Sequence, residues 1–295
     1  MTLPIRPPYL PMEAVSVSEI PSGGDWQYEP KWDGFRCLAF RDGKKVRLQS
    51  KAGQPLERYF PELVAEFAEL EPEKFVLDGE IVVPVDGDLS FDDLLMRIHP
   101  AASRIAKLSR ETPASFISFD LLVSDRGQLL ANQPLRDRRP LLEKFAARYF
   151  GGTRLKLSPA TTDLRTVKRW FDSVGGGLDG IIAKQVSERY RTGERVGMVK
   201  VKQLRTVDCV VGGFRYASKG RLIGSLLLGL YDNDGLLHHV GFCSGLTTEH
   251  KKELTPKLEK LVKKPGFTGQ APGAVPVVGT LNARHNGNPS PPSSS

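Results

Sequence analysis

The irregular order of strand and helix segments over residues 1–203 most constrains the fold of this chain. Repeated βαβ units build parallel sheets, and they place strands and helices at regular intervals. Here short strand-like segments, glycine turns and single helices follow one another without a fixed spacing. The order therefore predicts an α+β domain with antiparallel sheets and accompanying helices.

Apolar periodicity and turn residues place the elements of this first domain. Strands are predicted where β-prone residues run between turns, and helices where apolar residues recur every three or four positions. The predicted strands are 26–29, 35–40, 45–49, 75–83, 115–124, 178–183 and 198–202. The predicted helices are 61–70, 91–98 with Ser90 opening a capping box, 137–149 and 162–174.

The character of the sequence changes after Lys202. Three β-rich segments at 207–214, 222–231 and 236–242 are separated by glycine-containing turns, and a basic helix at 248–263 follows. Short strands with such turns are typical of a small barrel such as an OB-fold. We expect a domain boundary near Gln203, an incomplete OB-fold over 204–270, and a disordered Pro/Gly/Ser-rich tail over 271–295.

Charge and cysteine content narrow the cellular setting. The chain carries 42 Lys and Arg against 34 Asp and Glu, a formal charge of +8, which favours polyanionic partners without requiring them. Its three cysteines are far apart, so no zinc site is expected. Early prolines interrupt any signal-peptide core, and no apolar run reaches membrane-spanning length. We expect a cytoplasmic protein with no membrane association.

The stretch Lys31-Trp32-Asp33-Gly34-Phe35-Arg36 carries the strongest chemical signal. A lysine amine, with a reference pKa of roughly 10.4, must lose its proton before it attacks phosphorus, and nearby cations favour that loss. Gly34 allows the chain to reverse, so that Arg36 points its donor fork at the same oxyanions. The alternative is a plain β-hairpin with Asp-Gly as its turn.

Five short stretches of the sequence share a pattern: residues 28–36, 77–80, 119–122, 178–184 and 199–202. Together they resemble the ATP-dependent DNA ligases of the covalent nucleotidyltransferase superfamily, and most closely the small bacterial ligases of end-joining repair. A single tetrapeptide is weak evidence, but five in the family's order are strong. The resemblance implies a nucleotidyltransferase domain with ATP-grasp-like antiparallel sheets and helices, followed by the OB-fold.

The resemblance implies that Lys31 attacks the α-phosphorus of ATP to form lysyl-AMP and release pyrophosphate. It also implies that Glu29 reads the adenine amino group and that Phe119 stacks on the base, although an aromatic residue in such an apolar strand is usually core. Arg36 and Lys184 are expected to add phosphate or ribose contacts.

Two lysines close to the end of the first domain are expected to act on the same phosphates. Lys200 and Lys202 alternate on one strand, so both side chains face one way. With Mg²⁺ or Mn²⁺, these cations would neutralise the phosphates and lower the pKa of Lys31. A solvated basic edge strand is the alternative.

Carboxylates and further cations complete the expected site. Glu80 and Asp179 are candidate metal and ribose ligands, since Mg²⁺ prefers one or two carboxylates plus phosphate oxygens. The family more often has glutamate where this chain has Asp179, so a water-mediated contact is expected there. Glu80 could instead be satisfied by backbone donors. Ser50, Lys51 and Arg58 are expected to contact the DNA backbone, with plain surface exposure as the alternative for Arg58.

The resulting hypothesis is an ATP-dependent ligase that seals 5′-phosphate/3′-hydroxyl nicks in double-stranded DNA during repair and recombination. We expect a monomer that works beside end-joining repair proteins. The resemblance ends after Gly269, where the family normally has a basic motif, so a truncated or frame-shifted sequence is expected. The alternatives are an RNA ligase, a capping-type nucleotidyltransferase, or a catalytically impaired nick-binding protein.

Overall fold

The computed structural model divides the chain into two compact units, Met1–Gln203 and Leu204–Ser295. The division falls where the sequence changes character. Each unit is described separately below. The residues described are 2–152, 154–173, 175, 177–203, 206–262, 266–267, 275–276 and 282–286.

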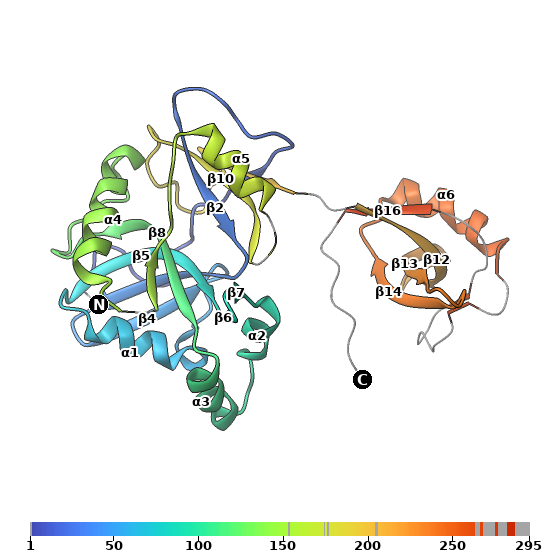
Figure 1. Ribbon diagram of the computed structural model, residues 1–295, viewed down its shortest axis with the longest axis horizontal. Helices are drawn as coiled ribbons and strands as arrows, with labels where there is room; N and C mark the ends of the chain where they lie inside the picture. The colour runs from blue at the N-terminus through green and yellow to red at the C-terminus, as the bar shows by residue number, and fades with distance from the viewer. Residues whose placement is uncertain are drawn as a thin grey trace. The chain divides into compact units, whose positions relative to one another are not determined.

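Two sheets form the framework of the first unit (Figure 1). Most neighbours are antiparallel as predicted, but β1 with β11 and β8 with β9 pair in parallel. The four-stranded sheet has the order β1 (Val15–Ser16), β11 (Met198–Lys202), β10 (Leu178–Gln185), β2 (Trp26–Trp32). The five-stranded sheet has the order β4 (Lys45–Ser50), β3 (Phe35–Asp42), β5 (Lys74–Val82), β8 (Ser115–Val123), β9 (Leu155–Leu157). A small hairpin pairs β6 (Pro84–Val85) with β7 (Asp88–Leu89).

Helices pack beside these sheets. The 3₁₀ turn η1 (Glu57–Tyr59) leads into α1 (Pro61–Glu69), and α2 (Phe91–Met96), α3 (Ala102–Glu111), α4 (Leu135–Tyr149) and α5 (Leu164–Asp172) follow. The Ser90 side chain caps α2 by accepting a hydrogen bond from the Asp93 amide at 3.2 Å, as predicted. Helix α3 was not predicted, because Ile105 is its one buried residue and its apolar signal is weak. Within the described residues, no helix is long and apolar enough to cross a membrane.

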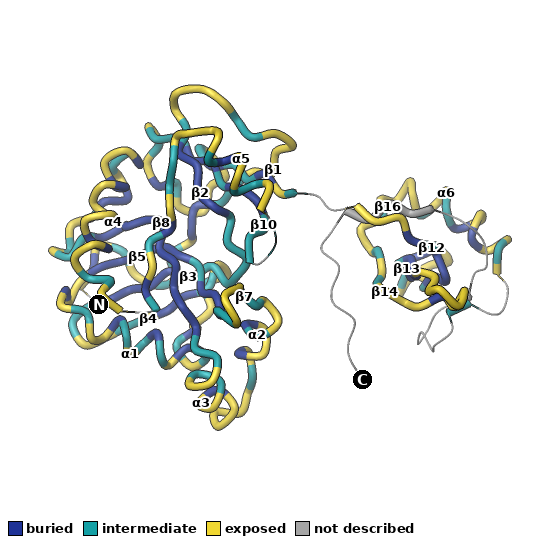
Figure 2. The backbone as a smooth tube through the Cα atoms, in the orientation of Figure 1, coloured by how far each residue is buried: buried dark blue, intermediate teal, exposed yellow. Residues whose placement is uncertain are grey.

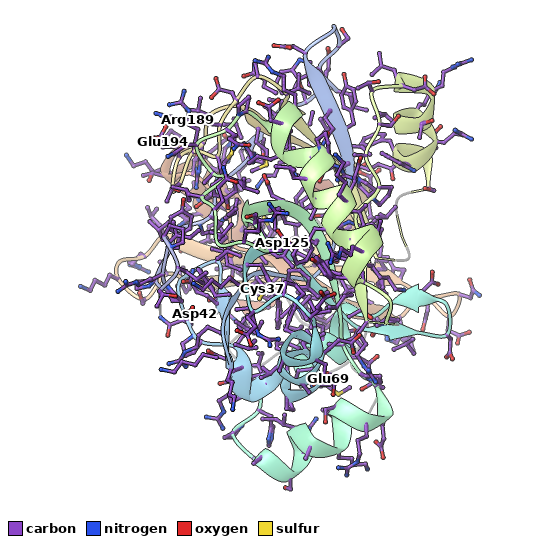
Figure 3. The ribbon with its side chains drawn as sticks, turned by 90° about the vertical axis from the view of Figure 1, so that its left-hand side faces the viewer. Cys37, Asp42, Glu69, Asp125, Arg189 and Glu194 are labelled. Carbon is purple, nitrogen blue, oxygen red and sulfur yellow. The ribbon has the colours of Figure 1, made fainter. Side chains whose placement is uncertain are left out.

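The central strands of the five-stranded sheet, β3, β5 and β8, are buried on both faces (Figure 2). Side chains alternate along a strand, so Cys37 and Ala39 pack with α1 and α4 residues on one face while Leu38 and Phe40 pack on the other. Cys37 lies among the interior side chains (Figure 3). Burial on both faces explains the near-continuous apolar character of β5 and β8 in the sequence.

The second unit is a small antiparallel sheet with one helix. Its strands are β12 (Thr206–Tyr216), β13 (Ile223–Tyr231) and β14 (Leu237–Cys243), and α6 (Thr248–Glu259) follows them. Two further strands, β15 (Val275–Pro276) and β16 (Asn282–Asn286), pair antiparallel with β12. Within the tail that was expected to be disordered, residues 275–276 and 282–286 form strands, and the rest of 271–295 lies outside the described residues. Backbone pairing with the edge of β12 requires no apolar periodicity, so the sequence pattern gave no sign of it.

Gly79 lies at the closest approach of β5 to β8, between Asp78 and Glu80. A Cβ at this position would lie 2.4 Å from Cζ of Phe116 and 2.6 Å from the Ile117 carbonyl oxygen. Only glycine fits this space without displacement of the backbone of β8.

We expect Gly79→Ala to lower the free energy of unfolding by about 1–3 kcal/mol, the usual cost of overpacking a core. Gly24→Ala is the matched control, because nothing lies within 4 Å of a Cβ added there. Urea denaturation of both variants measures the difference. Equal stability of the two variants would show that β5 and β8 can separate freely.

Candidate active site

A cavity of about 200 Å³ is lined by strands of both sheets in the first unit and by residues 11–14. The lysine motif supplies residues to both walls, because the chain leaves the four-stranded sheet after Trp32 and enters the five-stranded sheet at Phe35. The hairpin alternative for this motif is therefore wrong. The predicted site residues that line the cavity are Glu29, Lys31, Arg36, Lys51, Glu80, Phe119, Lys184 and Lys200.

Lys31 is held in place by the register of β2 against β10. It pairs with Gly180, whose φ of +140° suits glycine, and a Cβ there would lie 2.1 Å from the Val201 carbonyl oxygen. Next to this glycine, Asp179 Oδ2 accepts a hydrogen bond from Lys31 Nζ at 2.6 Å. Lys202 Nζ lies 2.8 Å from the same oxygen. One carboxylate oxygen thus joins two ammonium groups.

This cluster of charges alters the titration of its members. Burial raises the pKa of Asp179, but hydrogen bonds from Lys202 and Lys31 outweigh burial and leave the pKa below its usual range. Burial, together with repulsion from Lys31 and Lys202, lowers the pKa of Lys200. Burial and the negative charge of Asp179 raise the pKa of Asp33.

A buried ion pair between Glu29 and Lys184 lines the cavity near Phe119. Lys184 Nζ donates to both carboxylate oxygens of Glu29 at 2.8 Å, and Gln27 Nε2 donates to Oε1 of the same carboxylate at 2.7 Å. The Lys184 ammonium also lies 4.7 Å from the centre of the Phe119 ring. Lys184 was expected to contact phosphate or ribose, but its charge is committed to Glu29. Glu29 and Lys184 lie on the neighbouring strands β2 and β10 but 155 positions apart in the chain, so the sequence could not indicate this pairing.

The donor fork of Arg36 is also committed. Its Nε and Nη2 donate to the two carboxylate oxygens of Asp78, each at 2.6 Å. Its Cζ lies 4.6 Å from the centre of the Phe119 ring. The expected fork onto phosphate oxygens is therefore occupied by Asp78. Asp78 was not predicted as a site residue. The signal that could have identified it is its place in the 77–80 motif, next to Gly79 and Glu80.

Glu80 differs from these carboxylates because it has no partner. Among the described residues, no hydrogen bond or ion pair engages its side chain, so the alternative of satisfaction by backbone donors does not apply. Burial raises its pKa to about 8, against the lowering effect of Arg36 and Lys31. An unpaired carboxylate at this cavity fits a Mg²⁺ ligand. The described residues contain no group of three His, Cys, Asp or Glu side chains that could hold a metal by themselves, so substrate oxygens must complete such a site.

The three expected DNA contacts differ in their surroundings. Lys51 is exposed at the edge of the cavity, and its Nζ lies 2.9 Å from Oε2 of Glu13. Ser50 Oγ accepts from the Gln54 amide at 3.0 Å and so stabilises its own turn. Arg58 is exposed and donates to the Pro100 carbonyl at 2.9 Å. Ser50 and Arg58 do not line the cavity.

Several lining residues had no sequence signal. Met12 and its neighbours follow a proline-rich entry that predicted no element, and Met198 and Ile182 are ordinary apolar strand residues. Only the tertiary fold brings them to the site.

Comparison with known proteins places this geometry in a family. Residues 10–202 match the model of the ATP dependent DNA ligase domain. DNA ligase C2 of Mycolicibacterium smegmatis is 48% identical over 264 residues, which is 89% of this chain and 73% of that protein. The multifunctional non-homologous end joining DNA repair protein LigD of Mycobacterium tuberculosis is 33% identical over 255 residues, 85% of this chain and 31% of that protein. The crystal structure of the ligase domain from M. tuberculosis LigD aligns with a TM-score of 0.54 at 29% identity, covering 96% of this chain and 90% of that one. The chain belongs to the ATP-dependent DNA ligases.

Proposed function

We propose that Lys31 is the nucleophile through which this ligase transfers AMP from ATP to nicked DNA. The observation that carries the proposal is the position of Lys31 Nζ in the cavity, 2.6 Å from Asp179 Oδ2, with Lys200 and Lys202 beside it. A lysine at the surface would have no fixed direction. Here one hydrogen bond orients the amine toward the space that a nucleotide would occupy.

The reaction comprises three displacements at phosphorus. Deprotonated Nζ of Lys31 attacks the α-phosphorus of ATP, a P–N bond forms, and pyrophosphate leaves. An oxygen of the DNA 5′-phosphate then attacks the same phosphorus and releases Lys31, which leaves AMP on the DNA end. The 3′-hydroxyl finally attacks the 5′-phosphorus, loses its proton and displaces AMP. Positioning and charge stabilisation carry such transfers.

Some of the surrounding side chains are suited to contact the adenine base, and others to contact the phosphates. Phe119 offers its ring to adenine, and Glu29 offers a carboxylate edge whose orientation Lys184 fixes. Lys200 lines the cavity and is not tied to a carboxylate in the described part of the chain, so it is the cation available to phosphate oxygens. Lys202 instead shares Asp179 with Lys31 and holds that carboxylate in place.

We propose Glu80 as the protein ligand for Mg²⁺ or Mn²⁺, because its carboxylate is unpaired at the cavity. The metal supplies positive charge that offsets the negative charge of the phosphate oxygens. Asp179 remains a second ligand reached through water, since its Oδ2 already accepts from two ammonium groups.

The DNA partner of this proposal is a nicked duplex. Lys51 is the supported backbone contact, because it is exposed beside the cavity. The antiparallel strands β12 to β14 with α6 support an OB-fold as the second unit. Likeness to an end-joining repair protein supports a role in DNA repair. That the ligase acts as a monomer stays a prediction.

We expect Lys31→Ala to abolish formation of a covalent AMP adduct while the melting temperature stays within a few degrees of wild type. Lys202 still pairs with Asp179 in the variant, so no buried charge is stranded. Intact-protein mass spectrometry after incubation with ATP and Mg²⁺ measures the adduct. Lys107→Ala, an exposed lysine of α3, is the control and should adenylate normally. An adduct that persists in Lys31→Ala would refute the assignment.

We expect Glu80→Gln to be more stable than wild type above pH 8. Folding raises the pKa of Glu80 from 4.5 to about 8. The folded protein therefore gains the full stabilisation from a protonated Glu80 below pH 4.5, and its free energy of unfolding falls as pH rises through 8. Glutamine stays neutral throughout. The stability difference should therefore disappear at low pH.

Urea denaturation of both proteins at pH 5 and pH 9 measures this difference, with Glu69→Gln on the exposed side of α1 as control. A difference that does not change with pH would show that Glu80 ionises normally. Titration with Mn²⁺ and ATP should give weaker metal binding in Glu80→Gln than in the control.

We expect Lys51→Ala to weaken binding of nicked duplex and to reduce the slope of log affinity against log salt by about one, the effect of removing one phosphate contact. Lys156→Ala, an exposed lysine of β9, should leave the slope unchanged. Fluorescence anisotropy over a salt series measures both. An unchanged slope in Lys51→Ala would exclude a direct phosphate contact.

A further inference from the structure

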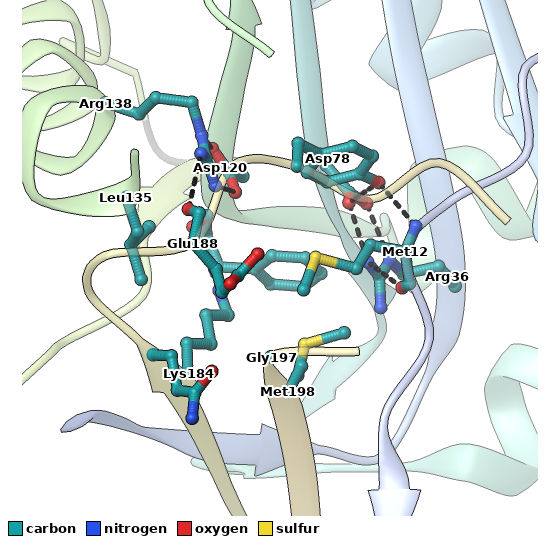
Figure 4. A pocket seen from close by; sticks show the side chains of 13 residues that line it. Met12, Arg36, Asp78, Asp120, Leu135, Arg138, Lys184, Glu188, Gly197 and Met198 are labelled. Atoms are coloured by element: carbon teal, nitrogen blue, oxygen red, sulfur yellow. Dashed lines mark hydrogen bonds and ion pairs between the residues drawn. The ribbon is translucent and has the colours of Figure 1, made fainter. Parts of the chain in front are cut away.

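Residues 11–14 form one wall of the cavity without belonging to a helix or strand. A closed ring of hydrogen bonds holds this wall. The Met12 amide donates to the Tyr190 hydroxyl at 3.1 Å, and that hydroxyl donates to Asp78 Oδ2 at 2.6 Å. Asp78 accepts both fork donors of Arg36, whose Nη2 donates back to the Met12 carbonyl at 3.3 Å. Figure 4 shows Met12, Arg36 and Asp78 joined by these contacts.

The ring is buried and each member depends on the others. Asp78 is fully buried, and Tyr190 and Met12 are each 6% exposed. A buried carboxylate without its partners is costly, and a network of this kind is worth more than its separate bonds. The Tyr190 hydroxyl is the one link that accepts from the wall and donates to the carboxylate at the same time. Phenylalanine at position 190 would keep the packing of the aromatic side chain and lose both hydrogen bonds of the hydroxyl.

The ring connects the wall to the surface that faces adenine. Arg36 stacks 4.6 Å from the centre of the Phe119 ring, so the carboxylate that fixes Arg36 also sets the environment of Phe119. Met12, Arg36 and Phe119 all line the cavity, while Tyr190 lies behind it. A displacement of Tyr190 therefore changes the shape of the cavity without removing any atom that touches the nucleotide.

We propose that Tyr190 is a positioning residue for nucleotide binding: its hydroxyl fixes the Met12 wall and, through Asp78, the Arg36 support of Phe119. This inference rests on the proposed role of the cavity as the ATP site. It assigns Tyr190 to the binding of the nucleotide and gives it no part in the chemical steps.

Packing alone is the competing explanation for Tyr190. Its ring stacks on Tyr9 at a centroid distance of 6.4 Å, and Arg138 lies 5.9 Å from its centre. Both contacts survive in Tyr190→Phe, so this substitution isolates the hydroxyl. Tyr149→Phe is the matched control, because its hydroxyl also donates to a carboxylate, Asp125, at 2.9 Å, but away from the cavity.

We expect Tyr190→Phe to raise the KM for ATP in AMP-adduct formation roughly three- to tenfold, the range for loss of about one net hydrogen bond. The maximal rate of adduct formation should stay within about twofold of wild type, as uniform loss of binding requires. Sealing of a saturating concentration of pre-adenylated nick, which needs no ATP, should also keep its maximal rate within about twofold of wild type. Tyr149→Phe should match wild type in all three assays.

A second measurement does not depend on the reaction. Hydroxyl-radical labelling followed by mass spectrometry should give more oxidation of Met12 in Tyr190→Phe than in wild type, while Met198, 4% exposed and outside the ring, stays equally protected. Unchanged KM together with unchanged Met12 oxidation would overturn the inference. An equal loss of adduct formation and nick sealing would also overturn it, because it would indicate general destabilisation. Absence of any AMP adduct in wild type would instead refute the proposed function, and Met12 labelling would still test the ring.

Discussion

One carboxylate oxygen, Oδ2 of Asp179, holds together the cluster of charges around the proposed nucleophile Lys31. Asp179 Oδ2 accepts from Lys31 at 2.6 Å and lies 2.8 Å from the Lys202 ammonium. Two ammonium groups this close would repel each other strongly without an anion between them. The arrangement leaves a cluster of charges partly buried, and the strand register of β2, β10 and β11 keeps this cluster in place. The site therefore has an excess of positive charge before any phosphate enters it.

The fold serves this charge cluster by bringing two sheets to one cavity. The chain crosses between them at Asp33-Gly34, so Lys31 belongs to one wall and Arg36 to the other. On the first wall, pairs between Glu29 and Lys184 and between Lys31 and Asp179 alternate along the strands. On the second wall, Arg36 is neutralised by Asp78, whereas Glu80 stays unpaired. Among the described acids that line the cavity, Glu80 is the one without a partner, and it is the group best suited to a cation that arrives with ATP.

The sequence was a good guide to local structure, and the fold places Lys31, the candidate nucleophile, at the cavity. Strand patterns located β2, β3, β5, β8, β10 and β11 to within a few residues, because buried strands carry a strong apolar signal. Weak elements such as α3, β1 and β9 were missed, since each is short or almost wholly exposed. Edge pairing of β15 and β16 was missed because backbone hydrogen bonds leave no mark on composition.

Partners of the charged residues could not be predicted in the same way. The motif placed Arg36 near the lysine, but only the fold reveals that Asp78 occupies its donor fork. Lys184 and Glu29 are far apart in sequence, so their pairing depends on strand register. Residue type indicated which groups belong to the site, and tertiary contacts decided which remain available to substrate.

The account depends above all on Lys31 as the residue that carries AMP. Fragmentation mass spectrometry of the protein after brief reaction with ATP and Mg²⁺ locates the adduct directly. A single AMP on Lys31, removed by incubation with pyrophosphate or with a nicked duplex, is the predicted result. AMP on Lys200, Lys202 or any other residue, or nucleotide held without a covalent bond while nicks are still sealed, would contradict it.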